Sequence, residues 1–327
     1  MTRLPGELSI FMRQSAERMD LFQSDTYYAF LEETNLFQVF RYEVKRDGKV
    51  VGRMQGYIQS DGGVLKRFFS RRAIINTGPF FAEDIHEDEV QALLRLCING
   101  LRGRVIYFET RNFRDYSSWR PIFEKAGLQY EPHYDFIIDT SDPDAVEERM
   151  GKSRKRDVKL SLKTGATIVD DPTWEDVTAF YEVLENLYKT RVKTPLFPLS
   201  FFEKLYHTSF SKFILVRYEG RIVGGTVLVY DNEKVYEWFA CGKDGVYKNV
   251  YPSTVATYHG IRFAAENGFK QFDMMGAGAP GDGGYGVRDF KAKFGGELVE
   301  YGRFLYVVNK PLYSLGKWAV KLMKKKR

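Results

Sequence analysis

The sequence predicts an α/β fold built from two similar units, and three observations lead to this prediction. The chain has 327 residues, which is long enough for about two domains with cores of their own. Segments with strand and helix patterns alternate along it, as expected for sheets flanked by helices. Short words also recur at a nearly constant distance: GKVVG at 48–52 matches GRIVG at 220–224, and FEKAG at 123–127 matches KAKFG at 291–295. These matches indicate either an internal duplication or a chance recurrence of common turn words.

The first half begins with a helix expected at 22–34, which has a Ser or Asp at its start. Residues 37–59 are expected to form two strands, because Asp47-Gly48 is a strong hairpin signal. The elements expected after this hairpin are a strand pair at 67–81, a helix at 87–101, a strand at 105–113, a helix at 117–128 and a strand at 129–140.

A second series starts after Asp142-Pro143, where a new helix is expected at 141–150. A hairpin around Gly220 is expected within 213–230. The other elements are helices at 151–165, 174–191, 252–268 and 288–296, and strands at 233–242, 270–275 and 297–308. We therefore expect domains at 1–140 and 141–309, followed by a basic amphipathic helix at 310–327.

Composition and charge limit the function classes. The net charge of +6 is matched by six basic side chains in residues 317–327, so the rest of the chain is formally neutral. This weakens a nucleic-acid reading based on charge alone. Two cysteines far apart and four scattered histidines predict a reduced compartment and no metal site. With no apolar run resembling a signal peptide or a spanning helix, we expect a cytoplasmic protein.

Two basic segments allow two interpretations each. The run at 151–165 carries six basic residues and one acid. It could contact an anionic substrate or an RNA backbone, or it could be a solvated helix face. In the last helix, Leu312, Leu315, Trp318 and Leu322 recur at helical spacing among lysines. Such a helix could lie on an anionic membrane through residues 312–327, or it could dock on the protein's own core.

Polar residues near the glycine-rich stretch GAGAPGDGGYG, at 276–286, are candidates for chemistry. Its Gly276-x-Gly278-x-x-Gly281 spacing does not open a full helix, which argues against a dinucleotide site. A flexible loop that closes over a substrate, or a plain connection, fits better. Asp273, at the end of the preceding strand, could orient an amine or act as a base, or it could cap a turn. Arg191 could bind a phosphate, or it could be a solvated cation at a helix end.

The duplication separates two lysines in GYGVRDFKAKFGGE, at 284–297. Aligned by their glycines, Lys293 corresponds to Lys125, whereas Lys291 corresponds to Phe123, an apolar helix position. A lysine at the position of a buried-type phenylalanine is the less expected of the two. We therefore take Lys291 as the functional candidate and Lys293 as structural or solvated.

In the order and spacing of several short motifs, the sequence resembles the FemAB family of peptidoglycan-bridge aminoacyltransferases and its acetyltransferase-like relatives. These motifs include FQSDTYYAFLEE, NTGPFF and RDVKLSLKTGATI, and in the second half ENGFKQFDMMGAG and FKAKFGGELVEY. The resemblance spans nearly the whole chain. It implies two tandem GNAT-like domains, each with a mixed, mostly antiparallel sheet flanked by helices.

The resemblance also implies a function and a site. The function is transfer of an acyl or aminoacyl group to an amine of a cell-envelope precursor, nucleotide-linked or lipid-linked. The Phe-Lys pair of the family maps onto Phe290 and Lys291, where a lysine could stabilise an oxyanion or a donor phosphate. With Lys291 and Asp273 as catalytic candidates, we expect substrate to be bound by Arg191, Tyr285, Arg288 and Phe290.

The donor and two other functions stay open. The donor could be an aminoacyl-tRNA, or an acyl-CoA or acyl-carrier protein, and no bound cofactor is expected. The turn after 233–242 has Gly245 but no repeated glycines, which argues against CoA binding in the usual GNAT manner. The alternatives are an N-acyltransferase that depends on CoA or carrier protein, and a non-catalytic binding module in envelope biosynthesis. The expected location is the cytoplasm, with peripheral contact at the inner face of the plasma membrane.

Overall fold

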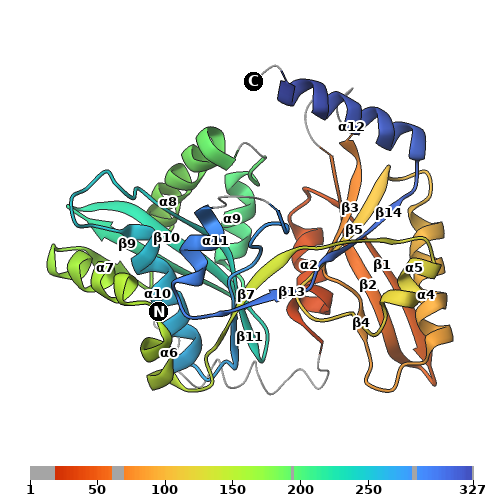
Figure 1. Cartoon of the computed structure of the whole chain (residues 1–327), viewed down its shortest axis with the longest axis horizontal. Coiled ribbons are helices and arrows are strands. Elements are labelled where there is room, and N and C mark those ends of the chain that lie inside the picture. The colour runs from red at the N-terminus through yellow and green to blue at the C-terminus, as the bar shows by residue number, and fades with distance from the viewer. Residues whose placement is uncertain (1–18, 61–69, 193–194, 282–285, 326–327) are drawn as a thin grey trace. The chain divides into compact units, whose positions relative to one another are not determined.

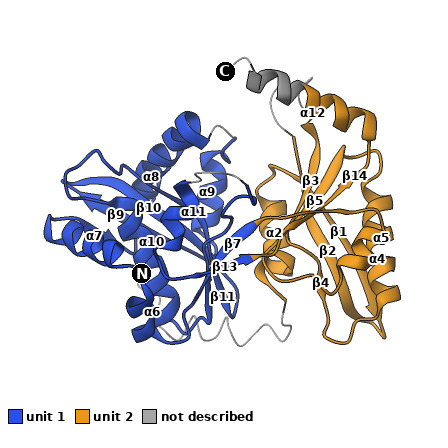
Figure 2. Cartoon of the chain, in the orientation of Figure 1, with its two compact units in different colours: residues 1–18, 134–299 blue, residues 19–133, 300–327 orange. Residues whose placement is uncertain are grey.

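The computed structural model describes residues 19–60, 70–192, 195–281 and 286–325, with side chains to Trp318. The described chain forms two compact units (Figure 2). Unit 1 contains Tyr134–Val299, and unit 2 contains Met19–His133 together with the segment that starts at Glu300. Each unit has a seven-stranded mixed sheet with helices packed on it (Figure 1). The α/β fold class expected from the sequence is confirmed.

The sheet of unit 2 has the order β1-β2-β3-β5-β14-β6, with β4 paired to β2. Only β3 and β5 run parallel among the strand pairs described in this unit. Its strands are β1 (Gln38–Arg46), β2 (Lys49–Gln59), β3 (Arg72–Thr77), β4 (Phe80–Phe81), β5 (Tyr107–Asn112), β6 (Gln129–Glu131) and β14 (Arg303–Val307). A 3-10 turn (Leu21–Gln23) precedes the helices α2 (Asp25–Glu33), α4 (Glu87–Leu101), α5 (Arg120–Lys125) and α12 (Lys310–Lys325).

The sheet of unit 1 has the order β13-β7-β12-β11-β10-β9-β8. Here β11 and β12 run parallel. Its strands are β7 (Tyr134–Asp139), β8 (Thr167–Val169), β9 (Ser211–Tyr218), β10 (Arg221–Tyr230), β11 (Lys234–Gly242), β12 (Gln271–Asp273) and β13 (Glu297–Glu300). Its helices are α6 (Pro143–Arg149), α7 (Lys152–Lys163), α8 (Trp174–Leu187), α9 (Leu199–Tyr206), α10 (Pro252–Glu266) and α11 (Gly286–Ala292), and a π-helical segment (Tyr188–Val192) follows α8.

The two recurring hairpins have the same turn. Asp47 and Gly48 have φ of +49° and +78°, and Glu219 and Gly220 have +49° and +73°. Two successive residues with positive φ define the tight turn that matches the twist of paired strands. Both words that suggested a duplication therefore mark equivalent hairpins, β1–β2 and β9–β10.

The two units exchange one strand each, which the sequence reasoning missed. Residues 129–140 and 297–308 were each expected as one strand, but each forms two strands that belong to different sheets. Pro132 interrupts the first, since proline cannot donate to a sheet ladder. Gly302, with φ of +64°, turns the chain in the second. The boundaries predicted at 140 and 309 are therefore wrong: β7 belongs to unit 1 and β14 to unit 2.

The core of each unit lies between its sheet and its helices. In unit 2 the fully buried residues include Met54, Leu93, Phe108 and Phe123. Burial of each such side chain stabilises the fold by about 1.5–3 kcal/mol. In unit 1 the corresponding residues include Leu228, Val235, Phe269 and Phe272. Among the described residues, no helix has the length and apolar character needed to cross a bilayer.

Candidate active site

Two predicted residues, Asp273 and Lys291, meet at the end of β12 in unit 1. This short strand lies between β11 and β7 and is followed by residues 274–281, which lead toward α11. The backbone turns sharply after β12, with φ of +51° at Met275 and +64° at Gly276. The turn brings the carbonyl groups of this segment within reach of α11.

Lys291 is buried, with 8% of its surface exposed. Its ammonium group donates hydrogen bonds to the carbonyl oxygens of Met274, Met275 and Gly276, the last at 2.9 Å. An ammonium group has three donors. All three donors of Lys291 are therefore engaged by the backbone. Lys293 is exposed, as expected for the structural or solvated lysine of the pair.

Arg288 holds the next part of the same segment. Its Nε donates to the carbonyl oxygen of Ala277 at 2.9 Å, and a terminal nitrogen donates to that of Ala279 at 2.7 Å. Its guanidinium group also lies 4.9 Å from the ring centroid of Tyr134. Because Arg288 and Lys291 are three residues apart on α11, they project from the same face of the helix.

Two buried aspartates lie beside the lysine on neighbouring strands. Asp273 is 0% exposed, and its Oδ1 accepts the N–H of Met275 at 2.9 Å. Its Oδ2 lies 3.6 Å from the Nζ of Lys234 on β11. Asp135, on β7, is also buried, and its carboxyl accepts its neighbour's N–H, from Phe136, at 2.8 Å. Asp273 thus shares a charged, water-poor environment with Asp135 rather than simply capping a turn.

Burial controls the protonation of this cluster. It raises the pKa of Asp135 well above its usual range, and the nearby charge of Asp273 adds to the effect. Burial also raises the pKa of Asp273 and of Glu237, and it lowers the pKa of Lys291 against the attraction of the three carboxyl groups. Two ammonium groups, of Lys291 and Lys234, face three carboxyl groups. Of the three carboxyl groups, Asp135 is the one most suited to keep a proton, because burial and the charge of Asp273 both oppose its ionisation.

Asp135 and Glu237 were not among the predicted site residues. Glu237 accepts hydrogen bonds from the hydroxyl groups of Thr257, at 2.7 Å, and Thr226, at 3.3 Å. Both acids interrupt apolar strand patterns, YDFII at 134–138 and VYEWF at 235–239. Because charged residues are rarely fully buried without partners, an acid inside such a run is the signal that could have identified them.

Phe290 packs against aromatic and cationic neighbours. Its ring lies edge-on to Phe294 at 5.2 Å between centroids. The guanidinium carbon of Arg154 lies 4.5 Å from the centroid of the Phe290 ring. Arg154, from the basic run, also donates to the hydroxyl of Thr254 at 3.2 Å. Through these contacts Phe290 helps to pack α11 against its neighbours. Its expected role in substrate binding stays a prediction.

The remaining predicted residues do not join this cluster in the described structure. Arg191 lies on the π-helical segment, and its side chain is exposed. Tyr285 lies outside the described residues. In the part of the chain that the structure describes, no group of three or more His, Cys, Asp or Glu side chains is arranged to hold a metal ion.

Residues 276–281 of the glycine-rich stretch are described, and residues 282–285 lie outside the described part of the chain, so the flexible loop considered above stays a prediction. Charged side chains bind the carbonyl groups of residues 274–277 and 279. The helix that follows, α11, begins only at Gly286 and has seven residues. A dinucleotide fingerprint would instead open a full helix directly from its glycines.

The N-terminus of α10 lies against a carboxylate from the preceding loop. Such a terminus binds a pyrophosphate when its backbone N–H groups are available to the anion. Here the N–H of Ser253, in the first turn, donates to the carboxylate of Asp244 at 3.2 Å. A carboxylate at this position competes with a bound anion and repels it. Gly242 also packs closely here, because a Cβ added to it would lie 2.5 Å from the backbone nitrogen of Ser253.

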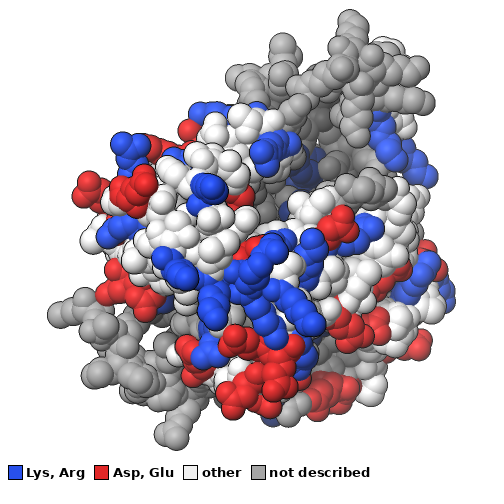
Figure 3. All heavy atoms as spheres, turned by 60° about the vertical axis from the view of Figure 1, so that its left-hand side comes forward, with Lys and Arg blue, Asp and Glu red and all other residues white. Residues whose placement is uncertain are grey.

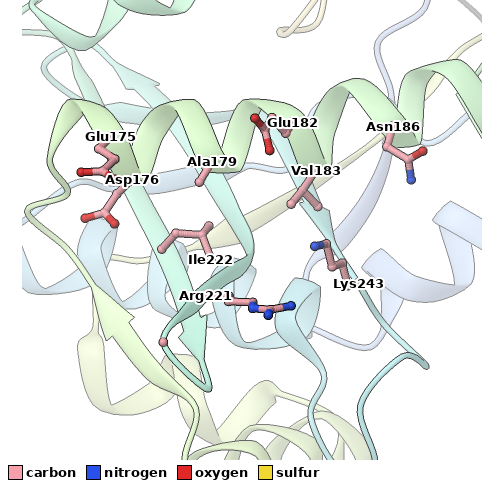
Figure 4. A pocket seen from close by; sticks show the side chains of 10 residues that line it. Glu175, Asp176, Ala179, Glu182, Val183, Asn186, Arg221, Ile222 and Lys243 are labelled. Carbon is pink, nitrogen blue, oxygen red and sulfur yellow. The ribbon is translucent and has the colours of Figure 1, made fainter.

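A separate groove of about 580 Å³ lies between α8 and the strand ends near Arg221 and Lys243 (Figure 4). Helix α8 contributes three acids, Glu175, Asp176 and Glu182, and the two cations lie across from them. Asp176 already forms an ion pair with Arg217. The groove does not include Lys291 or its partners.

Helix α7 presents a basic stripe, which we define as Lys152, Arg156, Lys159 and Lys163. All four side chains are exposed. Their spacing of four, three and four residues places them on one face of the helix. Figure 3 brings forward the side of the molecule on which α7 lies and shows Lys and Arg side chains gathered there beside a group of acids.

The fold defines the class of this protein as tandem GNAT-like, as predicted. A family model described as an acetyltransferase (GNAT) domain matches residues 148–291, which lie in unit 1 and end at Lys291. Solved structures share the architecture over both units. The structure of FemX superposes with a TM-score of 0.70 at 16% identity, covering 96% of this chain and 98% of FemX.

The predicted resemblance to the FemAB family is confirmed by this structural likeness together with a sequence match. The Lipid II:glycine glycyltransferase of Staphylococcus haemolyticus is 32% identical over 100 residues, which are 29% of this chain and 24% of that relative. The match thus spans about a quarter of the relative's length. A C-terminal domain assigned to a lysylphosphatidylglycerol synthetase of Agrobacterium fabrum superposes with a TM-score of 0.61 at 14% identity, covering 97% of each chain.

Proposed function

We propose that this protein is a FemAB-like aminoacyltransferase that forms an amide bond on an amine of a cell-envelope precursor. The observation that carries the proposal is the buried cluster around Lys291, whose members other than Asp135 lie within the part of unit 1 that matches an acetyltransferase domain. The tandem architecture shared with FemX supports the same class. The named activity of the staphylococcal relative supports a lipid-linked precursor as acceptor.

The proposed reaction is an acyl transfer between an ester and an amine. The acceptor amine attacks the donor's ester carbonyl, a C–N bond forms, and the C–O bond to the donor breaks. The amine loses one proton, and the departing alkoxide gains one. Such reactions are accelerated mainly by positioning the two reactants and by stabilising the oxyanion. Since the three N–H groups of Lys291 bind backbone carbonyls, a direct contact with the oxyanion would require release of one of these bonds.

Two features favour aminoacyl-tRNA over acyl-CoA as the donor. The carboxylate of Asp244 takes a first-turn N–H of α10 and disfavours a pyrophosphate at that helix end. The basic stripe on α7 offers four exposed cations in a row, which suits a phosphate backbone. The alternative function is an N-acyltransferase that uses acyl-CoA or acyl-carrier protein as donor. Such an enzyme requires neither a basic stripe nor an RNA donor.

A donor screen tests the proposed function. The protein is incubated with a lipid-linked peptidoglycan precursor and, in separate reactions, with charged tRNAs, acyl-CoAs and acyl-carrier protein. We expect a new amide product, identified by its mass, only in the reactions that contain a charged tRNA. Transfer from acyl-CoA would establish the alternative. Binding of the precursor without any product would indicate a non-catalytic binding module.

We also propose peripheral contact with an anionic membrane through α12. Tyr313 packs against Tyr107 of β5 at 5.3 Å between ring centroids, so one face of the helix docks on unit 2. Leu315 and Trp318 face away, with 48% and 60% of their surfaces exposed. Exposed Trp and Leu with nearby lysines are typical of interfacial helices. We expect sedimentation with vesicles containing phosphatidylglycerol but not with purely zwitterionic vesicles, and reduced sedimentation of W318S. Equal sedimentation with both kinds of vesicle would contradict an electrostatic attraction between α12 and the anionic lipid.

A further inference from the structure

The segment 274–279 is bound on both sides by charged side chains of its own unit. Its carbonyl groups accept from Lys291 and Arg288, which together bind five of the six. Two of its amide groups have acids as partners: Asp273 accepts the N–H of Met275, and the carboxyl of Asp135 accepts that of Gly276. Four ionisable side chains thus bind this segment, in addition to backbone hydrogen bonds from Met274 and Ala277 to the carbonyl groups of β7.

This arrangement exceeds what a connecting loop needs. Connecting loops usually lie at the surface, where water satisfies their backbone groups. Removal of a charged group from water is unfavourable and must be offset by good partners. The equivalent helix position in unit 2 is Phe123, which is fully buried in an apolar core. A GNAT-like unit can therefore be built without a lysine here, which indicates that the charges serve the site.

The bound segment also contains strained backbone. Met275 has φ of +51° although it is not a glycine. A non-glycine residue in this region costs about 1–3 kcal/mol and is found mainly where the surroundings enforce it and function uses it. The carbonyl of Met275 is one of those bound by Lys291. The cations and acids together keep this residue in its strained conformation.

We propose that Arg288, Asp135 and Asp273 are positioning residues for the transfer reaction, and that with Lys291 they hold residues 274–279 in the conformation that transfer requires. We call these four residues the loop clamp. The proposal rests on the proposed function and adds residues to its site. The charged groups that face one another in the clamp region are Lys291 and Arg288 from α11, Asp135 from β7, Asp273 from β12, and Lys234 and Glu237 from β11.

The sharpest variant is Arg288→Lys, because it keeps the charge but removes the planar group that bridges two carbonyls. The matched control is Arg262→Lys, whose guanidinium pairs with Glu266 on the exposed side of α10. For R288K we expect kcat to fall about 10- to 100-fold, as for misplaced catalytic geometry, with KM changed less than about threefold. R262K should stay within about twofold of wild type in both constants.

Hydrogen–deuterium exchange of residues 274–281 gives a readout that does not need activity. In R288K and D135N, the amides of this segment should exchange at least about tenfold faster than in wild type, whereas R262K should match wild type. A kcat of R288K within about threefold of wild type overturns the proposal, as does unchanged exchange. If the wild-type protein transfers nothing, the proposed function fails and the exchange result alone decides on the clamp.

Discussion

At the residue scale, Lys291 shows how one substitution can convert an apolar core position into a polar centre. Phe123 fills the equivalent position in unit 2 with a ring that packs against Phe304 at 4.6 Å between centroids. Lys291 instead brings an ammonium group into unit 1 and satisfies three carbonyl groups with it. The burial is tolerated because acids on three neighbouring strands balance the charge.

Replacement of Lys291 by methionine should destabilise unit 1 and abolish transfer. The variant leaves three carbonyl groups unpaired and three carboxyl groups with one cation fewer. Loss of one partner from such a buried network costs about 3–5 kcal/mol in the free energy of unfolding. Urea denaturation measures this change. Lys293→Met, two residues away and exposed, is the control and should change stability by less than about 0.5 kcal/mol. Equal effects of the two variants would contradict the assignment.

The raised pKa of Asp135 predicts how stability depends on pH. Its carboxyl binds a proton more tightly in the folded than in the unfolded protein. Above the usual carboxyl range near pH 4, the folded state therefore holds more protons, and the free energy of unfolding falls as pH rises toward the folded pKa. Asp135→Asn, which mimics the protonated form, should flatten this fall. Chemical denaturation at pH 5 and pH 8 measures it, with the exposed Asp289→Asn as control. An unchanged slope in D135N would count against a proton retained on Asp135.

At the element scale, α7 and the segment after β12 have different kinds of polar surface. The clamp around 274–279 is buried or half-buried, whereas the basic stripe on α7 is exposed and can exchange partners with solvent ions. An exposed stripe attracts a polyanion in a salt-dependent way, whereas buried pairs are screened much less. The two elements therefore have separable effects, the stripe on donor binding and the clamp on turnover.

Neutralisation of the stripe should weaken binding of aminoacyl-tRNA and reduce its salt dependence. In Lys152→Gln/Arg156→Gln, the slope of log affinity against log salt should become shallower by about 1 to 2, since two phosphate contacts are lost. Fluorescence anisotropy of labelled tRNA over a salt series measures this. Arg95→Gln/Arg102→Gln, at exposed positions on α4 and directly after it in unit 2, is the matched control. The same slope in the stripe variant and wild type would contradict the assigned surface.

Gly302 is an element boundary that side-chain substitution should disrupt. Its φ is +64°, and a Cβ would lie 2.3 Å from the ring of Tyr130. Gly302→Ala should therefore lower the free energy of unfolding by more than about 1 kcal/mol. Gly316, in α12, has open space around its Cα, and Gly316→Ala should stabilise its helix by about 0.5–1 kcal/mol. Thermal unfolding compares them, and equal midpoints would argue against the strand break at Gly302.

At the scale of the whole molecule, the sequence reasoning identified the two units, their equivalent hairpins and the tandem GNAT-like class. It did not predict which strands pair with each other. The hydrophobic pattern of a strand such as 134–139 shows which residues point to each face of the sheet, but not which strands lie beside it. The exchange of β7 and β14 was missed for this reason. At the site, comparison with Phe123 led to Lys291, while Asp135 was missed because a lone acid in an apolar strand was read as part of the strand.

The measurement that tests the central claim most directly is product analysis of one transfer reaction. Wild-type protein is mixed with a lipid-linked peptidoglycan precursor that carries a free amine and with tRNA charged with a radiolabelled amino acid. The account predicts label in the precursor through an amide bond that resists mild alkaline hydrolysis, and a kcat that falls in R288K but not in R262K. Precursor that binds tightly and stays unlabelled with every charged tRNA would contradict it.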